Sequence, residues 1–204
     1  MRGAGARFVA LRARGFELDG GRVQRVLTDG APVDVDAVVV AAGAHSRALA
    51  SQLGADVPLE TERGYHAMLA QPSVVPRIPV CAGEDKWFAT PMEEGLRIAG
   101  TVELAGLDAA PDFRRAERML EGAKRLLPSL TYASVERWMG HRPSLPDSLP
   151  VIGSAPRASN AWFAFGHGHV GLTGAPVTAE IVDALLAGTR PAVDPAPFSA
   201  QRFG

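Results

Sequence analysis

A near-continuous apolar run, residues 33–42, constrains the fold of this chain more than any other feature. Unbroken apolarity is typical of a strand buried on both faces, as in a parallel sheet covered by helices. The run ends at Gly43, after which Ser46 can cap a helix over residues 47–53, and Gly54 is placed to close that helix in the left-handed conformation. The sequence therefore predicts a buried strand that passes through a glycine turn into a helix. That geometry presents backbone groups at the carboxyl edge of a sheet, where α/β proteins bind ligands.

A second strand–glycine–helix passage lies near the C-terminus. Residues 161–165 predict a strand, residues 166–174 a glycine-rich loop, and a helix follows from Pro176, which suits a first turn, to about Ala187. The first six letters of the loop match the G-x-G-x-x-G pattern of dinucleotide-binding turns. That unit needs a second strand with an acid within about 30 residues, whereas only a proline-rich tail follows Gly188. We therefore do not interpret the loop as a cradle for ADP.

The same loop can still bind a ligand, even though it is not a dinucleotide-binding turn. Glycines let the main chain approach a flat ligand, and a helix N-terminus offers free N–H groups and a partial positive charge. Such a site stabilises negative charge on a bound ring or anion. A tight structural turn is the alternative interpretation, and the residues alone leave both open.

The remaining chain predicts β-hairpins and one further helix. Residues 7–18 and 22–28 form extended runs around a Gly-Gly turn, and Asp29-Gly30 is a strong hairpin signal. Short β-like runs between Pro and Gly breaks predict an antiparallel sheet, at residues 64–70, 79–82, 86–90 and 95–102. A helix begins at Pro111 and Asp112 and ends at Pro128. The expected fold class is α/β in the broad, α+β sense.

One arginine stands apart from the others. Arg142 lies in an apolar context within residues 138–153, where three prolines are expected to hold the chain away from helix and sheet. An arginine in such a place is either paired structurally or available to a ligand carboxylate, and the residues alone leave both open.

Charge and cysteine content narrow the class of protein. The 204 residues carry 21 basic and 22 acidic side chains, which argues against a nucleic-acid partner. The single cysteine, Cys81, argues against a disulfide framework and a cysteine-based metal site, and we expect no metal. No stretch approaches the roughly 20 apolar residues that span a bilayer. The expected location is the cytoplasm, with peripheral attachment to the inner membrane left open.

Several ordered segments resemble one family. Residues 138–153, followed by Gly-His-Gly-His-Val-Gly-Leu-Thr at 166–173, are similar to the C-terminal signature of the FAD-dependent D-amino-acid oxidase superfamily, above all its bacterial D-amino-acid dehydrogenase small-subunit branch. Residues 36–46 resemble the strand-and-glycine motif beside FAD, and residues 62–66 and 87–103 resemble the substrate-domain strands. The resemblance implies a partial FAD-binding domain, residues 1–57 and 140–204, and an antiparallel-sheet substrate subdomain, residues 58–139.

The resemblance also implies site residues. Arg142 matches the arginine that pairs with the substrate carboxylate, and the other substrate-facing positions are Tyr65, His66 and His169. The positions that it places beside FAD are Ala42, Gly43, Gly153, Gly168, His169, Val170, Gly171, Leu172 and Thr173. His45 replaces the aromatic residue that is usual at its position.

The implied activity is the FAD-dependent oxidative deamination of D-amino acids or related amino and imino acids. Arg142 orients the carboxylate, hydride passes to the flavin, and the product imine hydrolyses, so no catalytic histidine is required. The substrate and the electron acceptor, oxygen or a quinone or electron-transfer protein, stay open.

Family members begin with a strand, a G-x-G-x-x-G turn and a helix for the ADP end of FAD, and this sequence starts in what resembles the middle of that fold. We expect a C-terminal fragment, inactive in isolation, that holds FAD weakly or not at all and self-associates through an unpaired sheet or apolar face. The alternatives are a non-catalytic remnant that binds carboxylates or a partner, and a simple α+β interaction domain.

Overall fold

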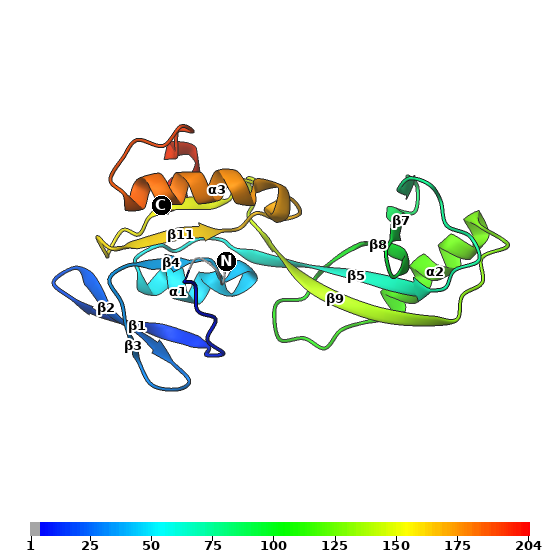
Figure 1. Cartoon of the computed structure of the whole chain (residues 1–204), viewed down its shortest axis with the longest axis horizontal. Helices are drawn as coiled ribbons and strands as arrows, with labels where there is room; N and C mark the ends of the chain where they lie inside the picture. Colours follow the sequence, from blue (N-terminus) through cyan, green and yellow to red (C-terminus); the bar gives the residue numbers. More distant parts are fainter. Residues whose placement is uncertain (1–4) are drawn as a thin grey trace. The chain divides into compact units, whose positions relative to one another are not determined.

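A computed structural model of the chain describes residues 5–204. Two compact units make up the chain (Figure 1). The first contains the chain up to Leu59 together with Ser144–Gly204, and the second contains Glu60–Pro143. The chain therefore leaves its first unit once and returns to it. Among the described residues, no helix is both long enough and apolar enough to cross a membrane.

The first unit begins with an antiparallel sheet in the order β1-β2-β3. Its strands are β1 (Ala13–Asp19), β2 (Arg22–Thr28) and β3 (Val33–Asp34). Gly20 and Gly21, with φ of 54° and 73°, make the first turn. Both expected hairpins are confirmed, although the extended run from Arg7 becomes a strand only at Ala13, where pairing with β2 begins.

A second sheet of this unit, in the order β10-β11-β4, carries both strand–glycine–helix passages. It contains β4 (Val38–Val40), β10 (Val151–Ser154) and β11 (Ala161–Phe165), with β11 parallel to β4 and antiparallel to β10. The expectation of a long strand buried on both faces is wrong. Only three residues of the apolar run are in the strand, and Val39 is 39% exposed. The reason is position, because β4 is the edge strand of this sheet and pairs with β11 alone.

Helices follow both of the parallel strands. A 3-10 turn, η2 (Gly43–His45), leads from β4 into α1 (Ser46–Gln52), and α3 (Gly171–Leu186) follows β11. Ser46 does not cap α1 as expected but is its first residue, and its buried hydroxyl has no hydrogen-bond partner among the described residues. Gly54 and Gly188, with φ of 89° and 67°, lie just beyond the two helix ends, and the prediction for Gly54 is confirmed.

The start of α3 differs from the prediction. The helix begins at Gly171, so Pro176 lies inside it and not in its first turn. A proline there has no N–H for the carbonyl four residues earlier. After α3 the chain forms only the short 3-10 helices η3 (Ala196–Phe198) and η4 (Ala200–Phe203). Among the described residues, no strand comes after α3.

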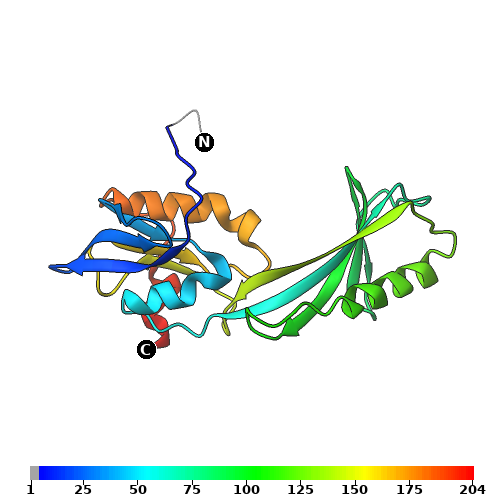
Figure 2. The same cartoon turned by 90° about the horizontal axis from the view of Figure 1, so that it is seen from below.

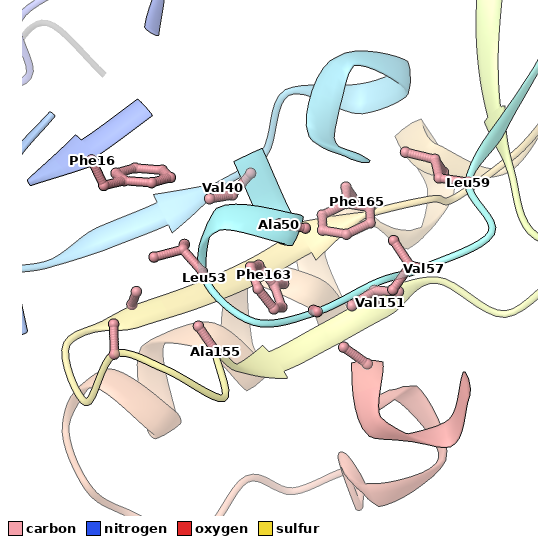
Figure 3. Packing of buried hydrophobic residues seen from close by; sticks show 14 of the residues in the cluster. Phe16, Val40, Ala50, Leu53, Val57, Leu59, Val151, Ala155, Phe163 and Phe165 are labelled. Atoms are coloured by element: carbon pink, nitrogen blue, oxygen red, sulfur yellow. The ribbon is translucent and has the colours of Figure 1, made fainter. Parts of the chain in front are cut away.

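The core of the first unit lies where α1 packs against the second sheet. Phe163 and Phe165 of β11 contact each other edge to face and pack with Val40, Ala50 and Leu53 (Figure 3). A smaller cluster on the opposite face joins Ile152 of β10 to α3. Helices pack on both faces of this sheet, and β11, whose residues are alternately buried and half-buried, comes closer than β4 to the environment predicted for β4.

The second unit is an antiparallel sheet with one helix, as predicted. Its order is β6-β7-β8-β5-β9, from β5 (Glu60–Ala70), β6 (Val80–Ala82), β7 (Trp87–Met92), β8 (Gly95–Leu104) and β9 (Ser134–Ser144). The helix α2 (Arg114–Leu126) lies along β5 and β8 (Figure 2). Its apolar residues pack on Tyr65, Ala67 and Leu69, whereas the intervening residues of β5 point to the opposite face.

The expectation that prolines keep residues 138–153 out of sheets is wrong. Strand β9 runs through Arg142 and Pro143, and β10 begins directly after Pro150. The strand β9 lies at the edge of its sheet, where the missing N–H of a proline costs no ladder hydrogen bond.

Candidate functional site

Backbone groups gather at the carboxyl edge of the β10-β11-β4 sheet. Because β4 and β11 are parallel, the segments that follow them, Ala42-Gly43 and residues 166–170, leave the sheet at the same edge. Gly43 and Gly168 have φ of 55° and 53°, a region that favours glycine. A Cβ at Gly43 would meet no atom within 4 Å, so open space lies beside this turn.

The first turn of α3 adds hydrogen-bond donors to this edge. A helix cannot bond its first N–H groups internally, and Gly174 is the first residue of this turn to bond back, to the Val170 carbonyl at 2.8 Å. The amides of Gly171, Leu172 and Thr173 precede it. Leu172 is 92% exposed, and Val170 is also exposed. This turn combines amide donors with uncovered apolar surface, and such surroundings suit a flat, partly anionic ring.

His167, which the sequence analysis did not single out, fixes the loop to its helix. Its Nε2 lies 2.9 Å from the Thr178 hydroxyl, which itself donates to the Gly174 carbonyl at 2.9 Å. Burial lowers the pKa of His167. The contact joins residues eleven positions apart, and no local pattern announces it. His169, by contrast, is exposed on the same loop.

Gly153 is not gathered at this edge. It lies within β10 opposite Phe163, two residues from the end where Val151 pairs with Phe165. Its φ is 148°, and a Cβ there would meet no atom within 4 Å. The structure thus places Gly153 apart from the turn at Gly43 and the loop at Gly168.

Arg142 lies in the second unit, on the sheet face opposite α2. Gly64 of β5 leaves the space for its guanidinium, because a Cβ there would overlap the Arg142 side chain. The guanidinium donates to the Thr101 carbonyl at 3.2 Å. Burial lowers the pKa of Arg142, Glu62 raises it and Arg97 lowers it. Within its own unit the side chain makes no ion pair, so most of its donors are not engaged by this part of the chain.

His66 lies on the same face, two residues from Gly64. Its ring stacks on Trp138 of β9 with centroids 5.0 Å apart and planes at 24°. Burial lowers the pKa of His66 below 6.5, with a further lowering by Arg97 and an opposing effect of Glu136. The lowered pKa favours the neutral form of the ring. Its Nδ1 is buried and has no hydrogen-bond partner among the described residues.

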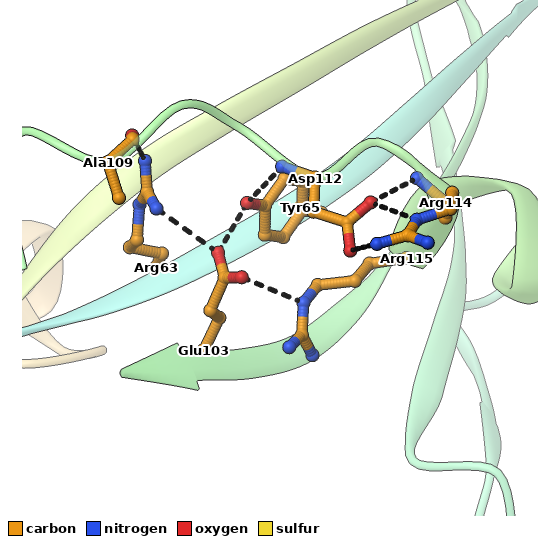
Figure 4. A network of polar contacts seen from close by, with 7 residues as sticks. All are labelled: Arg63, Tyr65, Glu103, Ala109, Asp112, Arg114 and Arg115. Atoms are coloured by element: carbon orange, nitrogen blue, oxygen red, sulfur yellow. Dashed lines mark hydrogen bonds and ion pairs between the residues drawn. The ribbon is translucent and has the colours of Figure 1, made fainter. Parts of the chain in front are cut away.

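Tyr65 is separated from these residues, contrary to the expectation that it faces the substrate with His66. Its hydroxyl donates to Glu103 at 2.5 Å and accepts from the Asp112 amide at 3.0 Å, and its ring meets Phe113 edge to face (Figure 4). The physical reason is the two-residue period of a strand, which sends neighbouring side chains to opposite faces. The structure brings Arg142 and His66 together and leaves Tyr65 beside α2.

Tyr65 belongs to a polar network that the sequence analysis missed. Arg63, 1% exposed, forms an ion pair with Glu103 at 3.4 Å and donates to the Ala109 carbonyl, while Arg115 contacts the other oxygen of Glu103 at 3.3 Å. The Tyr65 hydrogen bond is the main cause that lowers the pKa of Glu103, and burial raises the pKa of Tyr65. These contacts hold the segment between β8 and α2 against β5. The only signal in the sequence was an arginine and a tyrosine two positions apart in a strand.

Comparison with known proteins gives consistent matches. The family described as FAD dependent oxidoreductase (DAO) matches residues 1–185. A D-amino-acid oxidase of Bradyrhizobium diazoefficiens is 44% identical over 204 residues, which cover 98% of this chain and 48% of the relative. An uncharacterized oxidoreductase of Halorhodospira halophila is 36% identical over 188 residues, which cover 89% of this chain and 85% of the relative.

A solved structure shares the fold. Glycine oxidase from Geobacillus kaustophilus matches with a TM-score of 0.83 at 24% identity, over 94% of this chain and 52% of that protein. The chain therefore spans about half the length of both the D-amino-acid oxidase and the glycine oxidase.

Proposed function

The chain belongs to the FAD dependent oxidoreductase family, and from this membership we propose that it carries the carboxylate-binding and flavin-facing parts of an enzyme that oxidises D-amino acids or related amino and imino acids. The observation that carries the proposal is the Arg142 guanidinium, half-buried over Gly64 with one hydrogen bond and no ion pair within its unit.

Arg142 is suited to hold a carboxylate. A guanidinium has five donors in a planar fork that matches two carboxylate oxygens, and the single bond to Thr101 leaves donors for such a pair. Partial burial strengthens the interaction because the effective dielectric is lower there than in water. A carboxylate bound in this way has a fixed orientation, which contributes to the rate by placing the substrate's α-carbon.

Neutral aromatic rings lie beside this cation. The stacked rings of His66 and Trp138 supply a flat, partly apolar surface for the remainder of a small substrate. Since burial lowers the pKa of His66, the neutral form of its ring is favoured. We assign His66 a binding role and assign no protein base.

The first unit supports a place for the flavin. The amides of Gly171, Leu172 and Thr173 would face negative charge on the ring, and Gly43 and Gly168 would permit its close approach. Ala42, His169 and Val170 complete the proposed contacts, and Gly153, which lies inside β10, is not among them. FAD, when bound, supplies a two-electron acceptor for hydride.

Several finer points belong to the same proposal. We place the protein in the cytoplasm, as part of a longer or paired assembly, and expect the isolated chain to retain FAD weakly. Val39 on the edge strand β4 is exposed and favours self-association through that strand. A monomeric mass at micromolar concentration in sedimentation would contradict the self-association.

The proposed carboxylate site is tested by calorimetric titration of the chain with D-alanine. We expect Arg142→Met to weaken binding at least tenfold, and Arg118→Met, at an exposed arginine on α2, to leave it unchanged. Equal binding by the wild type and Arg142→Met would refute the assignment. A parallel titration with FAD, followed by flavin absorbance, separates an oxidoreductase part from a carboxylate-binding domain without flavin.

A further inference from the structure

Arg97 of β8 shares a sheet face with Arg142 and His66. Arg97 is paired directly with Met68 of β5, and His66 is paired with Ala99. Directly paired residues point to the same face, and so do residues two apart on one strand. Arg97 therefore lies diagonally across from His66, on the face opposite α2. In the described part of this unit α2 is the one helix, so no helix of the unit itself lies on that face.

The charge of Arg97 acts on both of the other residues. It lowers the pKa of His66 and the pKa of Arg142. Within its own unit the structure gives the Arg97 side chain no hydrogen bond and no ion pair, while its backbone is part of the sheet. Glu62, which acts on Arg142, and Glu136, which acts on His66, are the acidic groups found beside these two residues.

The spacing of the two arginines suits a short ligand with an anionic group at each end. Gly64, under Arg142, and Met68, opposite Arg97, are separated along β5 by about 13 Å at roughly 3.3 Å per residue. His66, stacked on Trp138, lies on β5 between these two positions, and burial lowers the pKa of its ring.

We propose that the substrate is an amino acid with an acidic side chain, whose second carboxylate binds Arg97 while Arg142 holds the first. This inference rests on the proposed function, because it assigns the α-carboxylate to Arg142. A site that offers charged donors to a substrate group discriminates against the analogue that lacks that group, since the donors are then left without a partner. The arginine pair thus selects D-glutamate over D-glutamine, which has nearly the same shape but carries an uncharged amide in place of the second carboxylate.

The test is calorimetric titration of the 204-residue chain with D-glutamate and with D-glutamine. We expect D-glutamate to bind at least tenfold more tightly. Arg97→Gln abolishes this ratio because it weakens the binding of D-glutamate far more than that of D-glutamine, whereas Arg97→Lys, which retains the charge, keeps most of the ratio. Arg118→Gln, the matched control on α2, changes neither affinity. Far-ultraviolet circular dichroism verifies that each variant is folded.

The outcomes distinguish this inference from the proposed function. Arg142→Gln is expected to weaken both ligands. If the wild type binds the two ligands equally and Arg142→Gln weakens both, the role of Arg97 is refuted and that of Arg142 stands. The role of Arg97 is likewise refuted if Arg97→Gln weakens both ligands alike. If the wild type binds neither ligand, the carboxylate site fails, and the inference fails with it.

Discussion

Arg63 and Arg142 lie on opposite faces of the same sheet and differ in how their charge is satisfied. Arg63 is fully buried and bonded to Glu103 and to the Ala109 carbonyl, and a tyrosine hydroxyl completes the network (Figure 4). Arg142 is half-buried and makes one hydrogen bond to a carbonyl within its unit. The first arginine holds the fold together. The second retains unused donors, and this difference, more than burial alone, marks the candidate binding residue.

Removing the partner of Arg63 is expected to have the largest effect. Glu103→Ala leaves a buried guanidinium without its counterion, which costs about 3 kcal/mol of unfolding free energy. Denaturant unfolding followed by circular dichroism measures the loss. Glu93→Ala, at an exposed carboxylate, is the matched control and should change the unfolding free energy by less than about 0.5 kcal/mol. A small effect of Glu103→Ala on the unfolding free energy would show that the ion pair of Arg63 does not stabilise the fold, and would contradict the contrast drawn with Arg142.

Arg142→Met is expected to give the reverse result. It should reduce D-alanine binding at least tenfold while the unfolding free energy changes by less than about 1 kcal/mol, because no ion pair within the unit is broken. The same unfolding experiment measures this. A loss of stability as large as that of Glu103→Ala would make Arg142 a structural arginine.

Low pH is expected to destabilise the fold through Glu103, the ion-pair partner of Arg63. The pKa of Glu103 is lowered from 4.5 in the folded chain, chiefly by the Tyr65 hydroxyl. Ionised Glu103 therefore contributes its full stabilisation of the folded chain above pH 4.5. This contribution is lost as the pH falls through the lower pKa of the folded state. Glu103→Gln should flatten the dependence of unfolding free energy on pH in this acidic range. An unchanged slope would contradict the role given to Glu103.

The smallest expected effect is a shift in the pKa of His66, which lies on the sheet face opposite α2. Arg97→Gln removes a positive charge beside His66 and should raise the pKa of that ring, which nevertheless stays below 6.5 because burial is the larger cause. Nuclear magnetic resonance titration of the histidine resonances measures this shift. If the pKa of His66 does not change, Arg97 is too far from His66 to bind the same ligand as Arg142.

Local patterns predicted much of the fold. The hairpins around Gly20-Gly21 and Asp29-Gly30, strand β11, the antiparallel sheet and helix α2 follow from turn residues and periodicity, which act over a few positions. The errors arose where position in a sheet decides. Strand β9 runs through Pro143, and Val39 is exposed, because both strands lie at sheet edges. Edge position is not encoded in any single window of sequence.

The sequence by itself determined the family, through ordered motifs, and identified Arg142 as the arginine to examine. It also determined the strand–glycine–helix passages, because glycine and apolar runs restrict the backbone locally. Only the tertiary structure decided which side chains share a face. It placed Tyr65 with Arg63 and Glu103, and it put His66 and Arg97 beside Arg142. These neighbours come from strands far apart in the chain. Strand pairing and register determine which side chains lie next to each other, and tertiary packing sets both.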